Sequence, residues 1–282
     1  MVSFVFSVGK MELNEIEQSL TKRFKSDIWR KFIRSINKYQ MLKEGDKVGV
    51  CISGGKDSML MALCFKHLHK YSKFKFDVEY IVMDPGYKPE NRKLIEQNAK
   101  KLDIDVKIFN SPIFEAVSEV EKSPCYLCAR MRRGYLYEYA KSLGCNKIAL
   151  GHHFDDAVET ILLSMFYGSE YKTMMPKLKS TSHVGMELIR PLYLVEEKDI
   201  INWRNYNNLK FLQCACRLTE AIAENNKELT SKRKEIKELL ATLKQTNPNV
   251  AKNIFSSIHR VNLTTILGYT DGKIDTSFMD NY

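Results

Sequence analysis

Apolar and polar positions follow two different periods along the middle of the chain. Short apolar runs predict strands at Lys47–Ile52, Phe76–Met83, Val106–Phe109, Lys147–Gly151 and Met186–Arg190. Between them, apolar residues recur at three- and four-residue steps, which indicates helices such as Met59–Phe65 and Pro89–Leu102. Strands that alternate with helices predict an α/β fold with a doubly wound, mostly parallel sheet, in which ligands bind at the carboxyl ends of the strands.

Helical patterns flank the predicted sheet. Residues 11–40 predict one basic helix, or two short ones, with an apolar face docked on the protein. The basic face either meets RNA phosphates or is ordinary solvated surface, and it consists of Lys22, Arg23, Lys25, Arg30, Lys31, Arg34 and Lys38. Charged helices are predicted at Glu220–Gln245 and Val250–Val261. We therefore expect an N-terminal helical extension (1–43), a central domain (44–216) and a C-terminal helical region (217–282).

The last part of the central domain has weaker patterns. Met174–Lys179 is predicted to be a basic loop, and Glu196–Trp203 a helix. Lys210–Gln213 looks like a strand that leads into Cys214-Ala-Cys216. The tail from Asp271 to Tyr282 is expected to be loosely ordered.

Composition narrows the class of protein. A formal net charge of +10 favours a polyanionic partner such as nucleic acid, although a lysine-rich solvated surface has the same charge. No apolar run is long enough to span a membrane and no signal peptide is evident, so we expect a cytoplasmic protein. The 7 cysteines favour free thiols, metal ligands or redox chemistry over a disulfide framework. Cys51, Cys64 and Cys145 are predicted to pack in the core.

A glycine-rich loop separates the first predicted strand from a helix. Its sequence is Cys51-Ile-Ser-Gly-Gly-Lys-Asp-Ser58. Gly54 and Gly55 permit a sharp turn and close approach to a ligand. The first amides of the helix, the charge of Lys56 and the hydroxyls of Ser53 and Ser58 together predict a phosphate cradle. The spacing differs from the Walker A loop, which has four residues between its glycines.

Two other strand ends should lie beside this cradle. Met83 and Asp84 end the second predicted strand, where they are placed to contact adenine or ribose. Gly151-His152-His-Phe-Asp155-Asp156 follows the fourth strand and precedes a helix predicted at Ala157–Phe166. Its carboxylates can hold Mg²⁺ against the phosphates or cap the helix, and we expect one of each. A zinc site on the two histidines is the weaker alternative, because no third and fourth ligands follow nearby.

The remaining cysteines can meet at one centre. Cys125 and Cys128 share a face of the first turn of a helix that is predicted to begin at Pro124. Such a pair fits a redox dithiol, half of a zinc site or iron–sulfur ligation. Together with Cys214 or Cys216 it gives three thiolates, which suit a [4Fe–4S] cluster with one open iron or a catalytic zinc site.

These motifs carry a resemblance to a known family. Ser53-Gly-Gly-Lys-Asp-Ser58 resembles the loop of the PP-loop (N-type) ATP pyrophosphatases, whose fold is adenine nucleotide alpha hydrolase-like. Further motifs in family order resemble the tRNA 2-thiocytidine synthetase group: Cys125-Tyr-Leu-Cys128, Arg132-Arg-Gly134, Gly151 to Asp156, Met165-Phe-Tyr-Gly168 and Ile189-Arg-Pro191. The resemblance implies that ATP is cleaved between its α and β phosphates and that a cytidine in a tRNA anticodon loop is thiolated. It also implies a [4Fe–4S] cluster on three cysteines. Cys214-Ala-Cys216 departs from the family motif, and we favour Cys216 as the third ligand because a C-x-x-Thr pattern begins there.

The candidate site follows from the motifs and the resemblance together. Candidate catalytic residues are Lys56, Asp57, Asp155 and Cys216. Nucleotide-binding candidates are Ser53, Gly54, Gly55, Lys56, Asp57, Ser58, Met83, Asp84, Gly151, His152, Asp155 and Asp156, and metal ligands are drawn from Cys125, Cys128, Cys214 and Cys216. Expected cofactors are ATP, Mg²⁺ and a [4Fe–4S] cluster, with zinc as the alternative. Expected partners are tRNA and a sulfur donor (sulfide or a cysteine desulfurase system), and a homodimer is an option.

Four other functions fit parts of the same pattern. They are a tRNA 2-thiouridine synthetase, a lysidine synthetase-like ligase, a small-molecule sulfur transferase and a nucleotide-binding regulator without catalytic activity. A ligase of the lysidine type needs no cluster, and a regulator makes no diphosphate.

Overall fold

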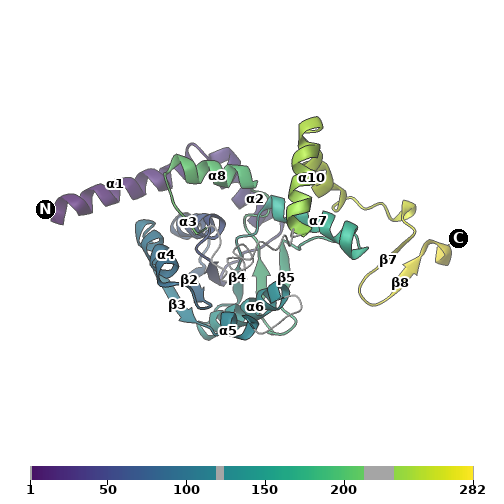
Figure 1. Cartoon of the computed structure of the whole chain (residues 1–282), viewed down its shortest axis with the longest axis horizontal. Helices are drawn as coiled ribbons and strands as arrows, with labels where there is room; N and C mark the ends of the chain where they lie inside the picture. Colours follow the sequence, from purple (N-terminus) through teal and green to yellow (C-terminus); the bar gives the residue numbers. More distant parts are fainter. Residues whose placement is uncertain (1, 119–123, 213–231, 282) are drawn as a thin grey trace. The chain divides into compact units, whose positions relative to one another are not determined.

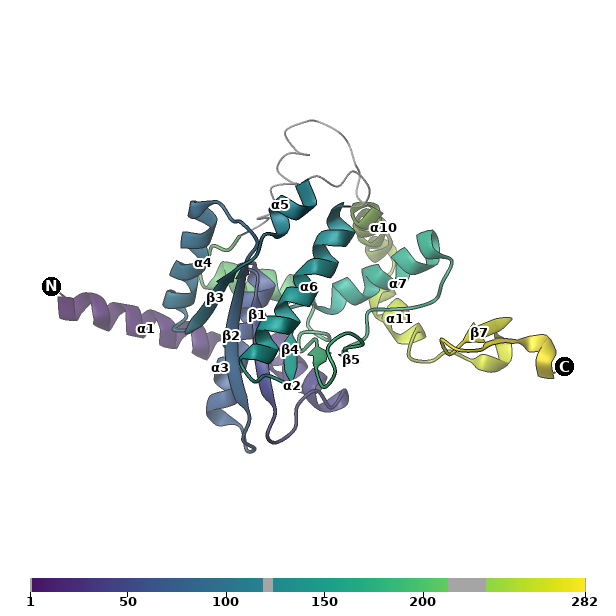
Figure 2. The ribbon, with the colours of Figure 1, turned by 90° about the horizontal axis from the view of Figure 1, so that it is seen from below.

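Six strands form one sheet in the order β3-β2-β1-β4-β6-β5, of which β1 to β5 are labelled in Figure 2. The computed structural model describes residues 2–118, 124–212 and 232–281. The strands are β1 (Lys47–Ile52), β2 (Asp77–Asp84), β3 (Val106–Asn110), β4 (Lys147–Ala149), β5 (Lys177–Lys179) and β6 (Glu187–Ile189). All neighbouring pairs are parallel except β5 and β6, which are antiparallel. The predicted doubly wound, mostly parallel sheet is therefore confirmed.

Helices cover both faces of this sheet. The helices of the unit that contains this sheet are α1 (Val2–Thr21), the π-helical turn η1 (Lys25–Trp29), α2 (Arg30–Lys38), α3 (Lys56–Tyr71), α4 (Pro89–Lys101), α5 (Ile113–Ser118), α6 (Pro124–Ser142) and α8 (Glu197–Tyr206), together with the start of α7 (Phe154–Gly168). The rest of α7, α10 (Lys232–Thr246), α11 (Val250–Ser257) and the short 3₁₀ turns η2 (Leu263–Thr265) and η3 (Phe278–Asn281) belong to a second unit. Figures 1 and 2 show α3 and α6 on opposite faces of the sheet. The second sheet is a hairpin of β7 (Gly268–Thr270) and β8 (Asp275–Ser277).

The chain divides into two units. One comprises Met1–Asp156 and Met175–Leu229, and it contains the six-stranded sheet and the N-terminal helices. The other comprises Ala157–Met174 and Thr230–Tyr282. Within this second unit, the buried carboxylate of Glu159 on α7 lies 3.5 Å from Arg233 Nε and 3.6 Å from Lys237 Nζ on α10. The division of the sequence at residues 43 and 216 stays a prediction.

The core of the first unit is built on the central strand. Val48 and Val50 of β1 are fully buried, because helices cover both faces of a parallel sheet. The N-terminal helices dock through their apolar side, where Phe32 of α2 meets Phe65 of α3 edge to face at 5.7 Å. Both rings are fully buried, and each contributes about 1.5–3 kcal/mol of hydrophobic stabilisation. The predicted docking of this amphipathic segment is thus confirmed, as is the burial of Cys51, Cys64 and Cys145.

Four local predictions were wrong. Lys177–Lys179, predicted as loop, forms the edge strand β5, because an edge strand needs only one partner and tolerates exposed lysines. Lys210–Leu212 is not a strand. The N–H of Leu212 donates to the carbonyl of Gly54, and the carbonyl of Lys210 accepts from the side chain of Asn98, so these groups do not pair with a neighbouring strand. The helix predicted from Ala157 begins at Phe154. The tail from Asp271, expected to be loose, contains strand β8 and turn η3. β8 pairs with β7 across a turn at Asp271-Gly272, which is a hairpin signal that the prediction overlooked.

Candidate active site

The glycine-rich loop bends sharply between β1 and α3. Gly54 has φ +83°, and a Cβ at this position would lie 2.6 Å from Ile95 Cγ1 and 2.8 Å from Leu212 Cδ1. Only glycine therefore fits both the conformation and the space. The Ser58 hydroxyl fixes the bend, because it accepts the N–H of Ser53 at 3.1 Å and donates to Gly55 O at 3.0 Å. The loop thus directs the first turn of α3 towards the carboxyl edge of the sheet.

A second loop lies directly against this turn. Residues 150–153 join β4, the neighbour of β1, to α7. A Cβ on Gly151 would lie 3.0 Å from Ser58 N and 3.1 Å from the carbonyl carbon of Asp57. The chain leaves β1 towards β2 and leaves β4 towards β6, so the two loops meet where the strand order reverses. Ligands of doubly wound sheets bind at this switch point.

The carboxylates of the second loop cap two helices. Asp156 Oδ2 accepts the N–H of His153 at 3.0 Å, and the N–H of Asp156 donates to His153 Nδ1 at 3.4 Å, which is a reciprocal cap at the start of α7. Asp155 Oδ2 accepts the N–H of Glu197, the first residue of α8, at 2.7 Å. We expected one of these carboxylates to lie at the nucleotide and the other to cap a helix. Both cap helices, and both lie beside the cradle, so the role at the nucleotide stays a prediction.

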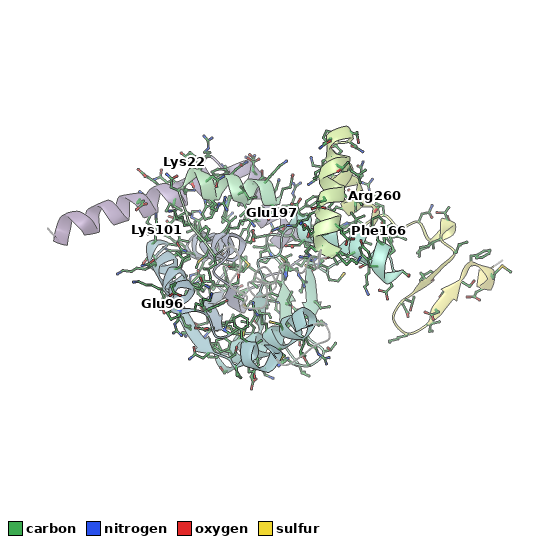
Figure 3. All side chains as sticks on the ribbon, in the orientation of Figure 1. Lys22, Glu96, Lys101, Phe166, Glu197 and Arg260 are labelled. Atoms are coloured by element: carbon green, nitrogen blue, oxygen red, sulfur yellow. The ribbon has the colours of Figure 1, made fainter. Side chains whose placement is uncertain are left out.

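Lys56 is held by two carboxylates. Its Nζ lies 2.9 Å from Glu197 Oε1 and 3.2 Å from Asp57 Oδ1 (Glu197 is labelled in Figure 3). Burial acts to lower the pKa of Lys56, but Asp57 and Glu197 outweigh it, so the pKa is raised and the side chain is charged at neutral pH. Burial raises the pKa of Asp57 despite the nearby His153 and Lys56. His153 Nε2 lies 3.9 Å from Asp57 Oδ1 and 4.0 Å from Glu197 Oε1, so one cluster joins α3, α7 and α8.

His152 is oriented by a buried arginine. Arg190 Nε donates to His152 Nδ1 at 3.3 Å, and its guanidinium also donates to Met175 O. Burial lowers the pKa of Arg190 to about 10, which still leaves it protonated at neutral pH. Arg190 thus fixes the ring of a predicted nucleotide-binding residue.

The end of β2 is close to the same loop. Asp84 Oδ1 accepts the N–H groups of Gly86 and Tyr87, at 2.9 and 2.7 Å, and Asp84 Oδ2 pairs with Arg92 at 3.0 Å. The Tyr87 hydroxyl donates to Ser53 O at 3.4 Å, which ties this turn to the cradle. The carboxylate of Asp84 shapes its own turn, and its predicted ribose contact stays a prediction.

One of the predicted thiols is placed beside this edge of the sheet. Cys128 is buried with Met83 and Ile113 in one apolar cluster, and Cys125 is one turn earlier on α6. The side chain of Cys125 and all of Cys214 and Cys216 lie outside the described residues. Within the described ranges, no group of three or more His, Cys, Asp or Glu side chains is arranged to hold a metal.

The chain reaches the cradle once more just before Cys214. Leu212 donates its N–H to Gly54 O at 3.1 Å, and Asn98 Nδ2 donates to Lys210 O at 2.9 Å. Cys214 follows Leu212 by two residues in the sequence. The segment that directly precedes the downstream cysteines in the sequence is therefore hydrogen-bonded to the phosphate loop.

The structure adds residues that the sequence reasoning did not select. Glu197 and His153 complete the charged cluster around Lys56, and Leu212 closes the loop at Gly54. Arg190 was noted only as part of a motif. Glu197 carried no local signal, since it is one of several acids in a charged helix, 141 residues from Lys56.

The fold and this loop define a PP-loop nucleotide-binding domain. Comparison with known families agrees, because the PP-loop domain family matches residues 25–225, and the chain belongs to that family. A tRNA-cytidine(32) 2-sulfurtransferase of Citrifermentans bemidjiense is 33% identical over 249 residues, which cover 87% of this chain and 93% of the relative. One of Vibrio parahaemolyticus is 34% identical over 258 residues, covering 89% of this chain and 80% of that one.

A solved structure shares the fold. The U34-tRNA thiolase NcsA from Methanococcus maripaludis, described with its [4Fe–4S] cluster, superposes with a TM-score of 0.64 at 21% identity. The match covers 86% of this chain and 80% of that chain. No helix in the described part of the present chain is long and apolar enough to cross a membrane.

Proposed function

We propose that this protein is an ATP-dependent tRNA thiolase, which replaces the C2 oxygen of cytidine 32 in the anticodon loop with sulfur. The observation that carries the proposal is the phosphate cradle at the switch point, in a chain that matches a tRNA-cytidine(32) 2-sulfurtransferase over 93% of that relative's length. We further propose that it works in the cytoplasm.

The cradle binds the phosphates of ATP. The first amides of α3 have no partner within the helix, and Lys56 adds a full positive charge beside them. Four carboxylates belong to the surrounding network: Asp57 and Glu197 pair with Lys56, Asp156 lies 3.6 Å from His153 Nε2, and Asp155 accepts the N–H of Glu197. Such a site repels a polyphosphate unless a divalent cation offsets the charge, so we propose that ATP binds with Mg²⁺, held by phosphate oxygens and one or two of these carboxylates.

The reaction then has two substitutions. The C2 oxygen of the base attacks the α-phosphorus, an O–P bond forms, and the bond to the β-phosphate breaks. Diphosphate leaves on the cradle, where Lys56 stabilises the charge that develops. Sulfide then attacks C2, the C2–O bond breaks, and AMP leaves with the oxygen. The base is reached from a single-stranded loop, as nucleobase chemistry requires.

Cys125, Cys128 and one of Cys214 or Cys216 would hold a [4Fe–4S] cluster. Their chemistry fits, because Cys128 lies at the carboxyl edge of the sheet, Cys125 is one helical turn away, and Cys214 follows the segment bonded to Gly54. When bound, such a cluster leaves one iron without a protein ligand, which can hold the sulfur that is transferred. We propose sulfide or a cysteine desulfurase system as the donor.

The decisive experiment is mass spectrometry of tRNA nucleosides from cells that lack the protein. We expect 2-thiocytidine to disappear and to return with wild-type protein but not with Lys56→Ala. Loss of 2-thiouridine instead would move the substrate to uridine. A colourless, iron-free protein after anaerobic purification, with zinc by metal analysis or no metal at all, would favour the zinc or ligase alternatives and contradict the cluster.

A further inference from the structure

A row of cations lies on the outer side of η1 and α2. A groove of about 620 Å³ is lined by Lys25, Trp29, Arg30, Ile33, Arg34, Asn37 and Lys38, and we name it the α2 groove. Arg30, Arg34 and Lys38 follow one another at four-residue steps, so they rise along the helix by about 6 Å each. All four basic side chains are exposed, while Trp29 and Ile33 are half-buried.

These cations differ from the other basic residue of the same helix. Lys31 points to α8, where its Nζ lies 3.1 Å from Glu196 and 2.9 Å from Asp199. In the described part of the chain, no carboxylate forms an ion pair with Lys25, Arg30, Arg34 or Lys38. Acidic residues are scarce locally, because Asp27 is the sole acid between Phe24 and Lys43.

This arrangement has a cost that ordinary solvated helices avoid. Like charges at i and i+4 destabilise a helix by about 0.2–0.5 kcal/mol a pair, and Arg30–Arg34 and Arg34–Lys38 are two such pairs. Solvated helices usually alternate the signs of their charges instead. A bound polyanion would reverse the sign of this contribution.

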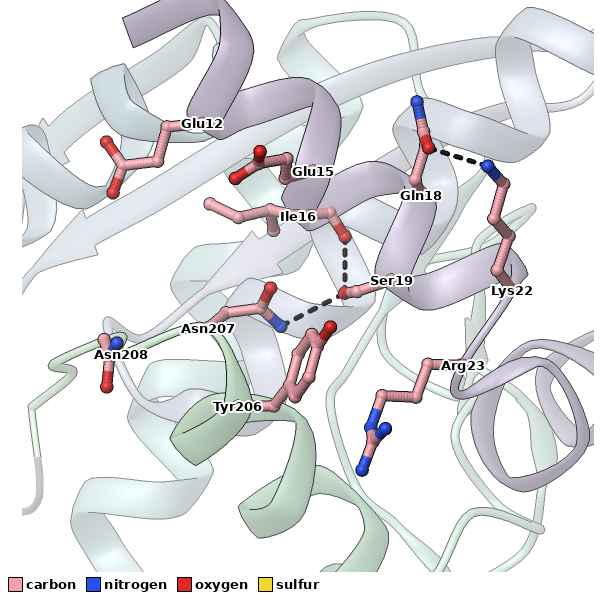
Figure 4. A pocket seen from close by; sticks show the side chains of 10 residues that line it. All are labelled: Glu12, Glu15, Ile16, Gln18, Ser19, Lys22, Arg23, Tyr206, Asn207 and Asn208. Atoms are coloured by element: carbon pink, nitrogen blue, oxygen red, sulfur yellow. Dashed lines mark hydrogen bonds between the residues drawn. The ribbon is translucent and has the colours of Figure 1, made fainter. Parts of the chain in front are cut away.

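Another polar pocket does not fit a polyanion. The pocket between α1 and α8 in Figure 4, of about 650 Å³, includes Glu12 and Glu15 beside Lys22 and Arg23. The charges of these four side chains cancel. Arg23 is also engaged over the ring of Tyr206, at 4.7 Å from its centroid.

We propose that the α2 groove binds the phosphate backbone of the tRNA, an inference that rests on the proposed function. The groove has a fixed position relative to the nucleotide site. Ser35 Oγ, on the neighbouring side of α2, accepts the N–H of Leu194 at 3.2 Å, and Lys31 holds the start of α8, where Glu197 meets Lys56. The half-buried indole and the amide of Asn37 suit a nucleic acid better than a smooth anionic surface, since they can contact bases and sugars.

The test compares two double variants of the anaerobically purified protein. Arg30→Gln/Arg34→Gln removes two charges from the groove, and Lys73→Gln/Lys75→Gln removes two exposed charges from the loop before β2, which does not line the groove. We measure binding of unmodified tRNA as a function of salt, together with ATP affinity and the urea midpoint. Two lost phosphate contacts should flatten the salt slope by about 1.4–1.8 and weaken binding at 0.1 M salt by about 25- to 60-fold.

The groove variant should raise KM for tRNA while kcat and ATP affinity stay at wild-type values. Its urea midpoint should not fall, because the substitutions also remove the two like-charge pairs. Arg30→Lys/Arg34→Lys should retain most of the binding, because it keeps the charges. Equal loss in both double variants, or no loss in the groove variant, would overturn the inference and leave the proposed function intact. Wild-type protein that binds no tRNA at any salt concentration would instead overturn the proposed function.

Discussion

We predict that the ion pair between Lys56 and Glu197 weakens the binding of nucleotide to the free protein. In the free protein Glu197 Oε1 lies 2.9 Å from Lys56 Nζ. When ATP binds, its phosphates must replace Glu197 as the partner of this lysine. The side chains are 19% and 26% exposed, between the surface and the interior. Surface pairs contribute about 0–1 kcal/mol, and breaking a buried pair costs about 3–5 kcal/mol, so we assign this pair about 1–2 kcal/mol.

Glu197→Gln removes the charge and keeps the shape. The amide oxygen can still accept a hydrogen bond from Lys56, and the backbone N–H that caps onto Asp155 is unchanged. We expect the variant to bind metal-free ATP, or its α,β-methylene analogue, about 5- to 30-fold more tightly than wild type, since tenfold corresponds to about 1.4 kcal/mol. In saturating Mg²⁺ the gain should shrink, because the metal already offsets the carboxylate charge.

The assay is calorimetric titration of the non-cleavable analogue, first in EDTA and then in Mg²⁺. Glu196→Gln is the matched control, because this neighbour pairs with Lys31 and Lys198 rather than with Lys56. The control should bind within about twofold of wild type. Equal or weaker binding by Glu197→Gln in EDTA would refute the idea that Glu197 holds Lys56 back from the nucleotide.

Three further predictions concern stability and the cluster. Asp57→Asn should raise the urea midpoint at pH 7, because burial raises the pKa of Asp57 and its negative charge therefore opposes folding. The same variant should abolish diphosphate formation, because Asp57 is a candidate catalytic residue. The gain in the midpoint should vanish as the pH falls below 3.8, where the wild-type carboxyl is protonated in both states, and a midpoint unchanged at pH 7 would contradict it. Gly151→Ala should lose about 1–3 kcal/mol of stability and weaken ATP binding, because its Cβ meets backbone at Ser58, whereas Gly134→Ala, with nothing within 4 Å, should not lose stability in the same urea titration. Cys216→Ser should lose iron and visible absorbance while ATP binding persists, and Cys214→Ser should retain them; the reverse pattern would assign the ligand to Cys214.

The phosphate cradle was predictable because its determinants are contiguous. A buried strand, two glycines and a helix start are adjacent in the sequence, and the local backbone already fixes how Ser53, Lys56 and Ser58 are presented. The sheet was predictable for the same reason, since strand and helix periods are local patterns. The doubly wound topology then followed from alternation.

The partners of the cradle were not predictable in this way. Glu197 reaches Lys56 only because β4 and β6 are neighbours in the sheet, so that the chain after β6 brings α8 back beside α3. The role of Leu212 was misread for a related reason. Its apolar run looks like a strand, but the hydrogen-bond acceptor for its N–H is the carbonyl of Gly54, a residue 158 positions earlier.

The same geometry explains why so many carboxylates surround a site meant for phosphate. The N-termini of α3, α7 and α8 converge there, and each end carries partial positive charge. In the free protein Asp57, Asp156 and Glu197 lie in the first turns of these three helices. A carboxylate at such a helix end contributes about 0.3–1 kcal/mol of stabilisation, a gain that burial outweighs for Asp57. ATP brings phosphates to the same helix ends, so ligand and carboxylates compete for them. A divalent cation that binds both would relieve this competition, which is the physical reason for the proposal that ATP binds here with Mg²⁺.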